Sequence, residues 1–483
     1  MNKRLIIKNL SKLMTAEAFL MLLPALVSVI YKEYRIAIIF TLTAAVIFAL
    51  FLPLSLVIPR GNKIYAKEGF AIVALAWITW SLAGAVPFYI SGVIPNYIDC
   101  FFETVSGLTT TGATILTEIT SLPKGILFWR SFTHWIGGMG VLVFVMAVVR
   151  LSENSMNLMR AEVPGPTVGK LVPRGGKSAK ILYGMYLALT LLEIVFLLLG
   201  KMPLFDSINH AFSNAGTGGF SIKNESIAYY NSAYIDGVIT VFMFLFGVNF
   251  NIYYFIILKN LRAAFKDEEL KVYFAVVACF TLIISFNILP LYKGFGEAFR
   301  YASFQVCSVI STTGFITYDF TLWPQLSQML LLFLMITGAC AGSTGGGIKI
   351  IRVVMLSKMI KTECKNLLNP REVHQIKING KAVQPAVVRG SATFFIIYFA
   401  VLVSSVFAIS TFNVDLVKNL SSVMTCIGNV GPGLGKIVGP VGNFSTLPEF
   451  VKIVLCADML FGRLEFFPII MIFSPRLWSR KFL

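Results

Sequence analysis

The chain has little charge for its size, and most of that charge is of one sign. Only 13% of its 483 residues are Asp, Glu, Lys or Arg, and 41 basic residues outnumber 23 acidic ones. The hydrophobic share of 57% and the mean hydropathy of +0.78 exclude an ordinary soluble protein, because such a protein needs a polar surface. The composition therefore predicts a protein whose solvent is lipid.

Several kinds of site are also missing from the sequence. The seven cysteines contain no CxxC pair, so neither a disulfide framework nor a zinc site is indicated, and we expect the cysteines to be small core residues. Paired carboxylates, metal clusters and nucleophile–base motifs are absent from the apolar runs, so no enzyme is expected. The net charge of +18 could suggest a nucleic-acid partner, but the basic residues lie in loops between apolar runs, which favours membrane topology instead.

Apolar runs recur along the whole chain, most of them near the ~20 residues that a helix needs to cross a bilayer. We predict ten long helices, at residues 16–30, 36–58, 70–90, 125–149, 181–199, 237–258, 272–289, 329–340 with a continuation, 392–412 and 451–473. Shorter or more polar segments between alternate pairs are predicted to be re-entrant, at 97–108, 204–215, 295–310 and 414–427. The first run lacks a cleavage site and is expected to be a retained helix.

The basic residues predict the orientation. Most of them fall on one side of this layout, and cytoplasmic loops collect Lys and Arg. Both termini are therefore expected in the cytoplasm, the re-entrant segments are expected to enter from outside, and the protein is expected in the cytoplasmic (inner) membrane.

The four re-entrant segments align with one another. Their sequences are SGLTTTGAT (106–114), SNAGTGGFS (213–221), SVISTTGFI (308–316) and TCIGNVGPG (425–433). A hydroxyl residue stands six positions before a glycine in each. The spacing of roughly 100 residues predicts four units of helix, half-helix with loop, and helix around one axis. We place a two-helix preface at residues 1–66 and the four pore repeats at 67–176, 177–266, 267–384 and 385–483.

A ring of such loops suits a dehydrated cation, because backbone carbonyls can replace its water shell without an ionised carboxylate. Glycine allows the positive φ that turns successive carbonyls toward one axis, and the short helices direct their negative ends there. One such loop alone would be weak support, since Thr and Gly also mark ordinary turns. The predicted filter residues are Thr110, Thr111, Gly112, Thr217, Gly218, Gly219, Thr312, Thr313, Gly314, Asn429, Val430 and Gly431, with potassium at the four ring glycines Gly112, Gly219, Gly314 and Gly431. Because different residues follow the glycines, we expect one well-specified carbonyl ring and weaker discrimination than identical loops would give.

A glycine-rich run, GACAGSTGGGIK, occupies residues 338–349. It is not a nucleotide-binding loop, because Ile348 stands where lysine is required and the run interrupts an apolar segment. We expect it to unwind the helix below the filter and to form a gate, with close helix packing of small residues as the alternative. The predicted gate residues are Gly338, Gly342, Ser343, Thr344, Gly345, Gly346, Gly347 and Lys349.

Arg463 lies inside the last apolar run, where a charge is costly unless it meets water or a partner. We predict an electrostatic barrier that works with the gate. A structural ion pair with Asp458 or Glu465 is the alternative.

These motifs, together with HWIGGMG (134–140), PGPTVGKLVPR (164–174), NVGPGLG (429–435) and GRLEFFP (462–468), resemble the Trk/Ktr/HKT superfamily of potassium transporters over nearly the whole chain, and most closely its bacterial TrkH/TrkG branch. The resemblance implies a filter at the four glycines, a gating loop at 338–349 and an arginine beneath the filter at Arg463. It further implies that potassium is the permeating ion, because a glycine at the position of Gly112 goes with potassium permeation in the family. It also implies a homodimer and a cytosolic TrkA-type regulatory ring that carries the nucleotide (ATP, ADP or NAD), with no cofactor bound directly to the membrane chain.

The sequence therefore predicts an all-α polytopic membrane protein with four pseudo-symmetric repeats around a central pore, preceded by two extra transmembrane helices, that takes up potassium. The alternative is a proton- or sodium-coupled symporter with broken helices, which would predict two inverted repeats instead of four parallel ones.

Overall fold

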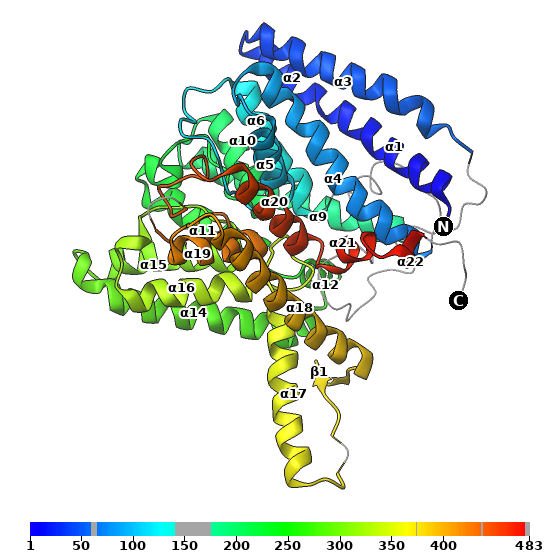
Figure 1. Ribbon diagram of the computed structural model, residues 1–483. Coiled ribbons are helices and arrows are strands. Elements are labelled where there is room, and N and C mark those ends of the chain that lie inside the picture. The colour runs from blue at the N-terminus through cyan, green and yellow to red at the C-terminus, as the bar shows by residue number, and fades with distance from the viewer. Residues whose placement is uncertain (59–64, 141–174, 373, 436–437, 479–483) are drawn as a thin grey trace.

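The computed structural model describes residues 1–58, 65–140, 175–372, 374–435 and 438–478 (Figure 1). The protein is an all-α polytopic membrane protein. Within these residues, six helices are long and apolar enough to cross a bilayer, and a bent helix pair raises that number to seven. The sheet in the described part of the chain is a small hairpin of β1 (Lys377–Ile378) and β2 (Lys381–Ala382).

Two spans precede the repeats and lie together along one edge of the molecule, coloured blue in Figure 1. They are α1 (Lys3–Leu20) with α2 (Leu22–Ile30), and α3 (Tyr34–Ser55). The helix begins at Lys3 and not at the predicted residue 16, because the Asn2 side chain caps it by accepting a hydrogen bond from the Leu5 amide at 3.2 Å. A hydropathy pattern marks where a helix becomes apolar, which is later than where it starts.

Four units of long helix, short helix and second helix follow. The first is α4 (Ala66–Ser91), α5 (Tyr97–Leu108) and α6 (Lys124–Gly138). The second is α9 (Gly175–Leu199), α10 (Leu204–Ala215), α11 (Ala233–Phe246) and α12 (Phe250–Ile257). The third is α14 (Glu268–Ile288), α15 (Phe295–Ile310), α16 (Gln325–Thr337) and α17 (Ile350–Leu368). The fourth is α18 (Pro385–Ser410), α19 (Leu416–Gly428), α20 (Glu449–Arg463) and α21 (Phe467–Ile472).

The short helices are the best-predicted elements. The segments predicted at 97–108, 204–215 and 295–310 coincide at both ends with α5, α10 and α15, and α19 begins two residues later than predicted and ends one residue later. The remaining helical elements are short: α13 (Leu261–Lys266) between the second and third units, η1 (Ser226–Tyr230) within the second, η2 (Leu289–Leu291) and η3 (Phe320–Leu322) within the third, and α22 (Pro475–Trp478) after the fourth. The exact boundaries proposed between the repeats stay predictions.

The second helix of each of the last three units is broken, and the predictions of continuous helices at 237–258 and 451–473 are wrong. α11 and α12 meet at an angle of 91°. α20 and α21 are separated at Glu465 and Phe466, whose φ angles are 54° and 64°. Apolar residues flank both breaks, so mean hydropathy over a span does not reveal them, although Asn249 and Glu465 lie within them. In the first unit α6 ends at Gly138, and the part of the predicted 125–149 helix from residue 141 onward lies outside the described residues.

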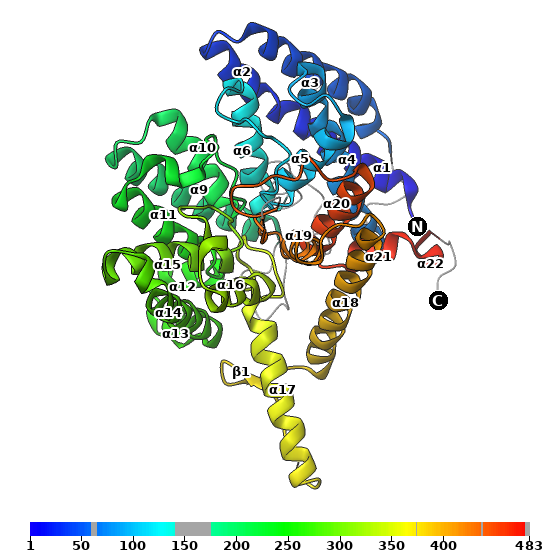
Figure 2. The ribbon, with the colours of Figure 1, turned by 60° about the vertical axis from the view of Figure 1, so that its left-hand side comes forward.

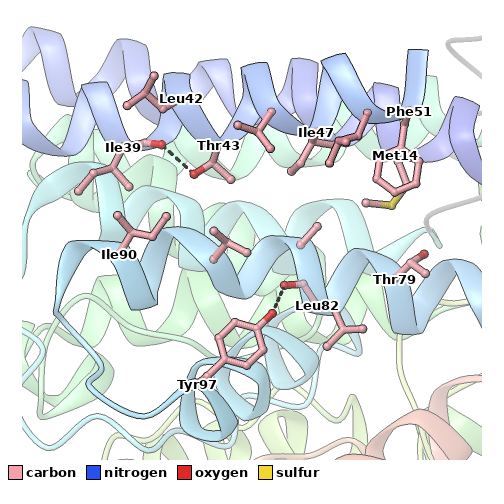
Figure 3. A pocket seen from close by; sticks show the side chains of 14 residues that line it. Met14, Ile39, Leu42, Thr43, Ile47, Phe51, Thr79, Leu82, Ile90 and Tyr97 are labelled. Carbon is pink, nitrogen blue, oxygen red and sulfur yellow. Dashed lines mark hydrogen bonds between the residues drawn. The ribbon is translucent and has the colours of Figure 1, made fainter. Parts of the chain in front are cut away.

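The outer surface of the helices is apolar, as a lipid environment requires. An apolar cleft of about 510 Å³ runs between α3 and α4, with Tyr97 at one side (Figure 3). Its polar groups bond within the protein, since Thr43 donates to the Ile39 carbonyl at 2.8 Å and Tyr97 donates to the Leu82 carbonyl at 2.7 Å. Five of the seven cysteines are buried as expected, but Cys279 and Cys364 are exposed, so the prediction that all are core residues is wrong for these two.

One element leaves the helical body. α17 extends away from the other helices, and the β1–β2 hairpin packs beside it before α18 returns (Figures 1 and 2). The exposed residues of this arm include Lys361, Lys365, Lys377 and Lys381. The predicted "continuation" of helix 329–340 is therefore a helix that carries basic side chains outside the helical body.

Candidate ion filter and gate

The four loop glycines meet in a closed ring. All have left-handed backbone angles, with φ of 79° at Gly112, 75° at Gly219, 81° at Gly314 and 103° at Gly431. A Cβ at Gly112 would overlap the carbonyl oxygen of Gly218 in the second loop. In the same way, a Cβ at Gly219 would overlap the Thr313 carbonyl oxygen of the third loop, and a Cβ at Gly314 would overlap the Val430 carbonyl oxygen of the fourth. A Cβ at Gly431 would lie 2.6 Å from the Thr111 carbonyl oxygen of the first loop. Each loop therefore contacts the next, and the fourth contacts the first.

The loops share more backbone structure than their glycines. The residue two positions before each ring glycine also has positive φ, at 55°, 55°, 61° and 54° for Thr110, Thr217, Thr312 and Asn429. The amide of the following residue donates to the carbonyl of the hydroxyl residue that stands six positions before the ring glycine. The pairs are Thr111–Ser106, Gly218–Ser213, Thr313–Ser308 and Val430–Thr425, at 2.8–2.9 Å. Left-handed backbone costs a non-glycine residue roughly 1–2 kcal/mol, so its fourfold recurrence marks a constrained site.

The loops can hold a cation with backbone oxygens. The filter positions are Thr, Gly, Asn and Val, so none supplies a carboxylate. The helices α5, α10, α15 and α19 all end at these loops, which places the negative ends of four helix dipoles beside the ring. The described residues contain no group of three His, Cys, Asp or Glu side chains that could bind a metal ion. The arrangement suits a weakly held, dehydrated monovalent cation.

A buried ion pair that the sequence analysis missed supports the first two loops. Arg130 on α6 contacts Glu103 on α5 at 2.5 Å, and Glu103 also accepts from the Ile115 amide at 3.0 Å. Arg130 donates to the Ser221 carbonyl at 2.7 Å and lies 3.7 Å from the centre of the Phe220 ring. The pair thus connects the exits of loops one and two. The signal in the sequence was one charge of each sign within neighbouring apolar segments, but nothing there showed that they meet.

His134 fills the space behind the second loop. Its Nδ1 lies 2.7 Å from the Gly107 carbonyl oxygen, and a Cβ at either Gly216 or Gly218 would overlap the histidine. The imidazole therefore fixes the distance between loops one and two.

Residues 338–349 are unwound, as predicted, and the alternative of a packed helix is wrong. The segment starts with Gly338 at φ 67° and ends with Lys349 at φ 80°. It lies directly against the filter, because a Cβ at Gly345 would be 2.8 Å from the Ser311 carbonyl oxygen, and the Gly346 amide donates to the Thr312 hydroxyl at 2.7 Å.

The second unit holds this segment from another side. The Cys340 amide donates to the Gly247 carbonyl and the Phe250 amide donates to the Gly342 carbonyl, each at 3.1 Å. The break between α11 and α12 therefore supplies backbone partners for the third unit, while the Lys349 ammonium bonds within the segment to the Gly345 carbonyl.

Arg463 bridges the segment to the first unit. Its guanidinium donates to the Thr344 carbonyl at 2.7 Å, to the Gly138 carbonyl at 2.6 Å and also to the Gly137 carbonyl. The predicted alternative, an ion pair with a nearby acid, is wrong: Glu465 pairs with Arg352 at 2.5 Å, and Asp458 accepts from Ser405 at 2.7 Å. The buried charge is instead satisfied by carbonyl oxygens.

Known proteins share this architecture. The family model of TrkH, described as a cation transport protein, matches residues 38–482. The Trk system potassium uptake protein TrkH of Vibrio parahaemolyticus is 36% identical over 99% of this chain and 100% of its own length. TrkH of Salmonella typhimurium is 37% identical over 86% of this chain and 87% of its own, and TrkG of Escherichia coli is 33% identical over 95% of each. The crystal structure of the potassium transporter TrkH from Vibrio parahaemolyticus matches with a TM-score of 0.89 at 33% identity, covering 99% of this chain and 100% of that one.

The ring geometry predicts that Gly219→Ala destabilises the protein. The methyl group would overlap the Thr313 carbonyl and alanine would be held at φ 75°, a combination that we expect to cost roughly 2–4 kcal/mol. Gly237→Ala is the matched control, because in the described part of the chain no atom outside its own helical turn lies within 4 Å of its added Cβ. Thermal melting of the purified proteins in detergent should show a lower midpoint for Gly219→Ala alone. Equal midpoints would contradict the close contact between loops two and three.

Proposed function

The chain belongs to the TrkH family of cation transport proteins, and we propose that it takes up potassium across the cytoplasmic membrane through the ring formed by its four loops. The observation that carries this proposal is the closed sequence of loop contacts, from Gly112 to the second loop and finally from Gly431 back to Thr111. Relatives that match over most of the chain are potassium uptake proteins by name, which supports the choice of ion.

The loops favour conduction over tight binding. Carbonyl oxygens replace part of the ion's hydration shell, and since no filter residue is acidic, a potassium ion can leave as readily as it enters. With the four short helices entering from outside and both termini in the cytoplasm, a potential of about 100 mV, negative inside, drives each ion inward with ~2.3 kcal/mol. Uptake then needs no chemical energy at the membrane chain itself.

A second candidate is ion-coupled symport. Transporters of that class bind ions at broken helices, and the second helices of units two to four are broken here, at residues 247–249, 338–349 and 464–466. Against this candidate, the four units have one common order of long helix, short helix and second helix, which produces a ring and not a pair of inverted halves.

We assign the gate to residues 338–349 and Arg463. The segment lies against the Thr312 hydroxyl and the carbonyl of Ser311, so in this position it is directly beside the filter. Its glycines carry no side chains that would resist a change of backbone conformation. Arg463 fixes it to the end of α6 through the Thr344 carbonyl.

The regulatory assembly is a further part of the proposal. A homodimer of this chain would bind a cytosolic TrkA-type ring that carries ATP, ADP or NAD. The arm of α17 and its hairpin supports this assignment, because it leaves the helical body and exposes four lysines suited to an acidic surface (Figure 2).

Conduction and symport predict different fluxes. In liposomes that contain only this protein, potassium flux should follow the imposed potassium gradient and potential, with no requirement for a proton or sodium gradient. The measurement is tracer uptake with the membrane potential clamped and the pH and sodium gradients varied separately. Potassium accumulation against its own electrochemical gradient, driven by either co-ion, would establish symport instead.

Arg463→Ala should raise potassium flux several-fold, because it removes a positive charge and the hydrogen bonds by which Arg463 connects the Thr344 carbonyl of the gate segment to Gly137 and Gly138 of α6. Arg463→Lys separates the two effects, since lysine keeps the charge but cannot reach Thr344 and Gly138 with one planar group. Exposed Arg262→Ala is the control, and flux is compared at equal protein in the liposomes. If the alanine variant conducts like the unaltered protein, Arg463 has no role in the barrier.

A further inference from the structure

We propose that Glu269 is a positioning residue that holds the gate segment closed, and that the adjacent Glu268 connects it to the cytoplasmic β1–β2 hairpin. The inference rests on the proposed function, because it takes residues 338–349 to be the gate. Glu269 is not among the filter or gate residues that the sequence predicts. It lies in the first turn of α14, at the start of the third unit.

A single carboxylate oxygen of Glu269 holds both ends of the gate. It accepts a hydrogen bond from the Ala341 amide at 2.6 Å and another from the Ile351 amide at 3.2 Å. Ala341 precedes the run of glycines at 342 and 345–347, and Ile351 follows it in the first turn of α17. Glu269 is only 4% exposed, so water offers the two amides little competition. The two positions that flank the glycine run therefore stay fixed relative to α14 unless one of these bonds is lost.

Glu268 is tied to the hairpin instead. Its amide donates to the Asn379 side-chain oxygen at 2.8 Å, and the Asn379 amide donates to its carboxylate at 3.0 Å. Asn379 also donates to Asp267 at 2.8 Å. Lys358 of α17 forms an ion pair with Glu268 and donates to the Lys377 carbonyl of β1 at 2.7 Å. The hairpin turn and the first turn of α14 are thus joined by reciprocal bonds.

Consecutive residues of one helical turn move together. A force that displaces the hairpin is transmitted through Glu268 to the backbone of Glu269, and from there to the two amides of the gate. The hairpin stands outside the helical body beside α17, where a cytosolic protein can reach it (Figure 2). The contacts therefore supply a continuous path from an accessible surface to the gate, and each step in it is a hydrogen bond or a peptide bond.

The first test is potassium flux through Glu269→Ala in liposomes without any regulatory protein. We expect a five- to tenfold increase, because the amides at both ends of the gate lose their acceptor. The flux through Glu269→Gln should lie between that of the unaltered protein and that of Glu269→Ala, since the amide oxygen of glutamine still accepts hydrogen bonds but carries no charge. Glu363→Ala, an exposed acid on α17, removes the same charge elsewhere and should leave flux unchanged. The ratio of potassium to sodium flux should not change in any variant.

A second measurement detects gate opening without relying on transport. Cys340 lies in the gate and is fully buried. In a background where exposed Cys279 and Cys364 are replaced by serine, a water-soluble thiol reagent should label Cys340 about ten times faster in Glu269→Ala than in the parent. Buried Cys307 and Cys426 report general unfolding and should remain unlabelled, as peptide mass spectrometry can verify.

The link to the hairpin is tested by Asn379→Gly. Glycine suits the φ of 52° at this turn and removes both side-chain bonds to residues 267 and 268. This variant should raise flux by a smaller factor than Glu269→Ala, and the double variant should conduct no more than Glu269→Ala alone. Multiplicative effects on flux would contradict the link.

The outcomes separate the two proposals. Folded Glu269→Ala protein with unchanged flux and unchanged Cys340 labelling would overturn the positioning role, even if the parent protein conducts potassium. Failure of the parent and of Arg463→Ala to move potassium at all would overturn the proposed function, whereas faster labelling of Cys340 in Glu269→Ala would still support the hydrogen bonds as the restraint on this segment.

Discussion

The structure depends on satisfying backbone polar groups at a depth where lipid offers no hydrogen bonds. A cation filter needs carbonyl oxygens that are not used by a helix, yet unpaired backbone in hydrocarbon costs several kcal/mol per group. The four loops resolve this conflict locally. In each, one amide returns to the carbonyl six positions before its ring glycine, as Thr111 does to Ser106, and the loops then pack on one another. Backbone that would be unacceptable against lipid is thereby buried among the other loops.

The same constraint explains the charged side chains inside the membrane domain. The Glu103–Arg130 pair and the Arg352–Glu465 pair are both largely buried, and in each the arginine also donates to a backbone carbonyl, of Ser221 or Ile348. An isolated charge would cost far more than such a pair, and loss of one partner typically costs roughly 3–5 kcal/mol. Burying these charged groups is therefore costly, and what they provide is a directional connection between segments that hydrophobic packing alone would not fix relative to one another.

The sequence predicted the parts that depend on local pattern. α5, α10 and α15 are bounded by turn residues and by polarity, so their limits could be derived to the residue, and the common glycine and hydroxyl spacing identified the loops that meet. What could not be derived depends on contacts between distant segments. The break between α11 and α12 occurs within FLFGVNFNIYY, where Gly247 and Asn249 are the local signals of a break. The backbone groups there find their partners about 90 residues away, at Cys340 and Gly342, which no local pattern reveals. Among the described residues, Arg463 donates to the carbonyls of Thr344, Gly137 and Gly138, and such backbone partners leave no trace in a sequence, so a search for a matching acid led to the wrong pair.

The units differ in the length of the break in their second helix. The break in the third unit is twelve residues long, from 338 to 349, whereas those of the second and fourth units are three residues each. The long segment contacts Gly247 of the second unit, Ser311 and Thr312 of its own third unit, and the Gly428 carbonyl of the fourth through the close approach of Gly346. Arg463 of the fourth unit also connects it to the end of α6 in the first. A loop restrained from every side has no small displacement that keeps all its hydrogen bonds, so its alternatives are discrete. Fourfold backbone similarity thus forms the ring of loops, and the one departure from that similarity places a single segment directly against this ring.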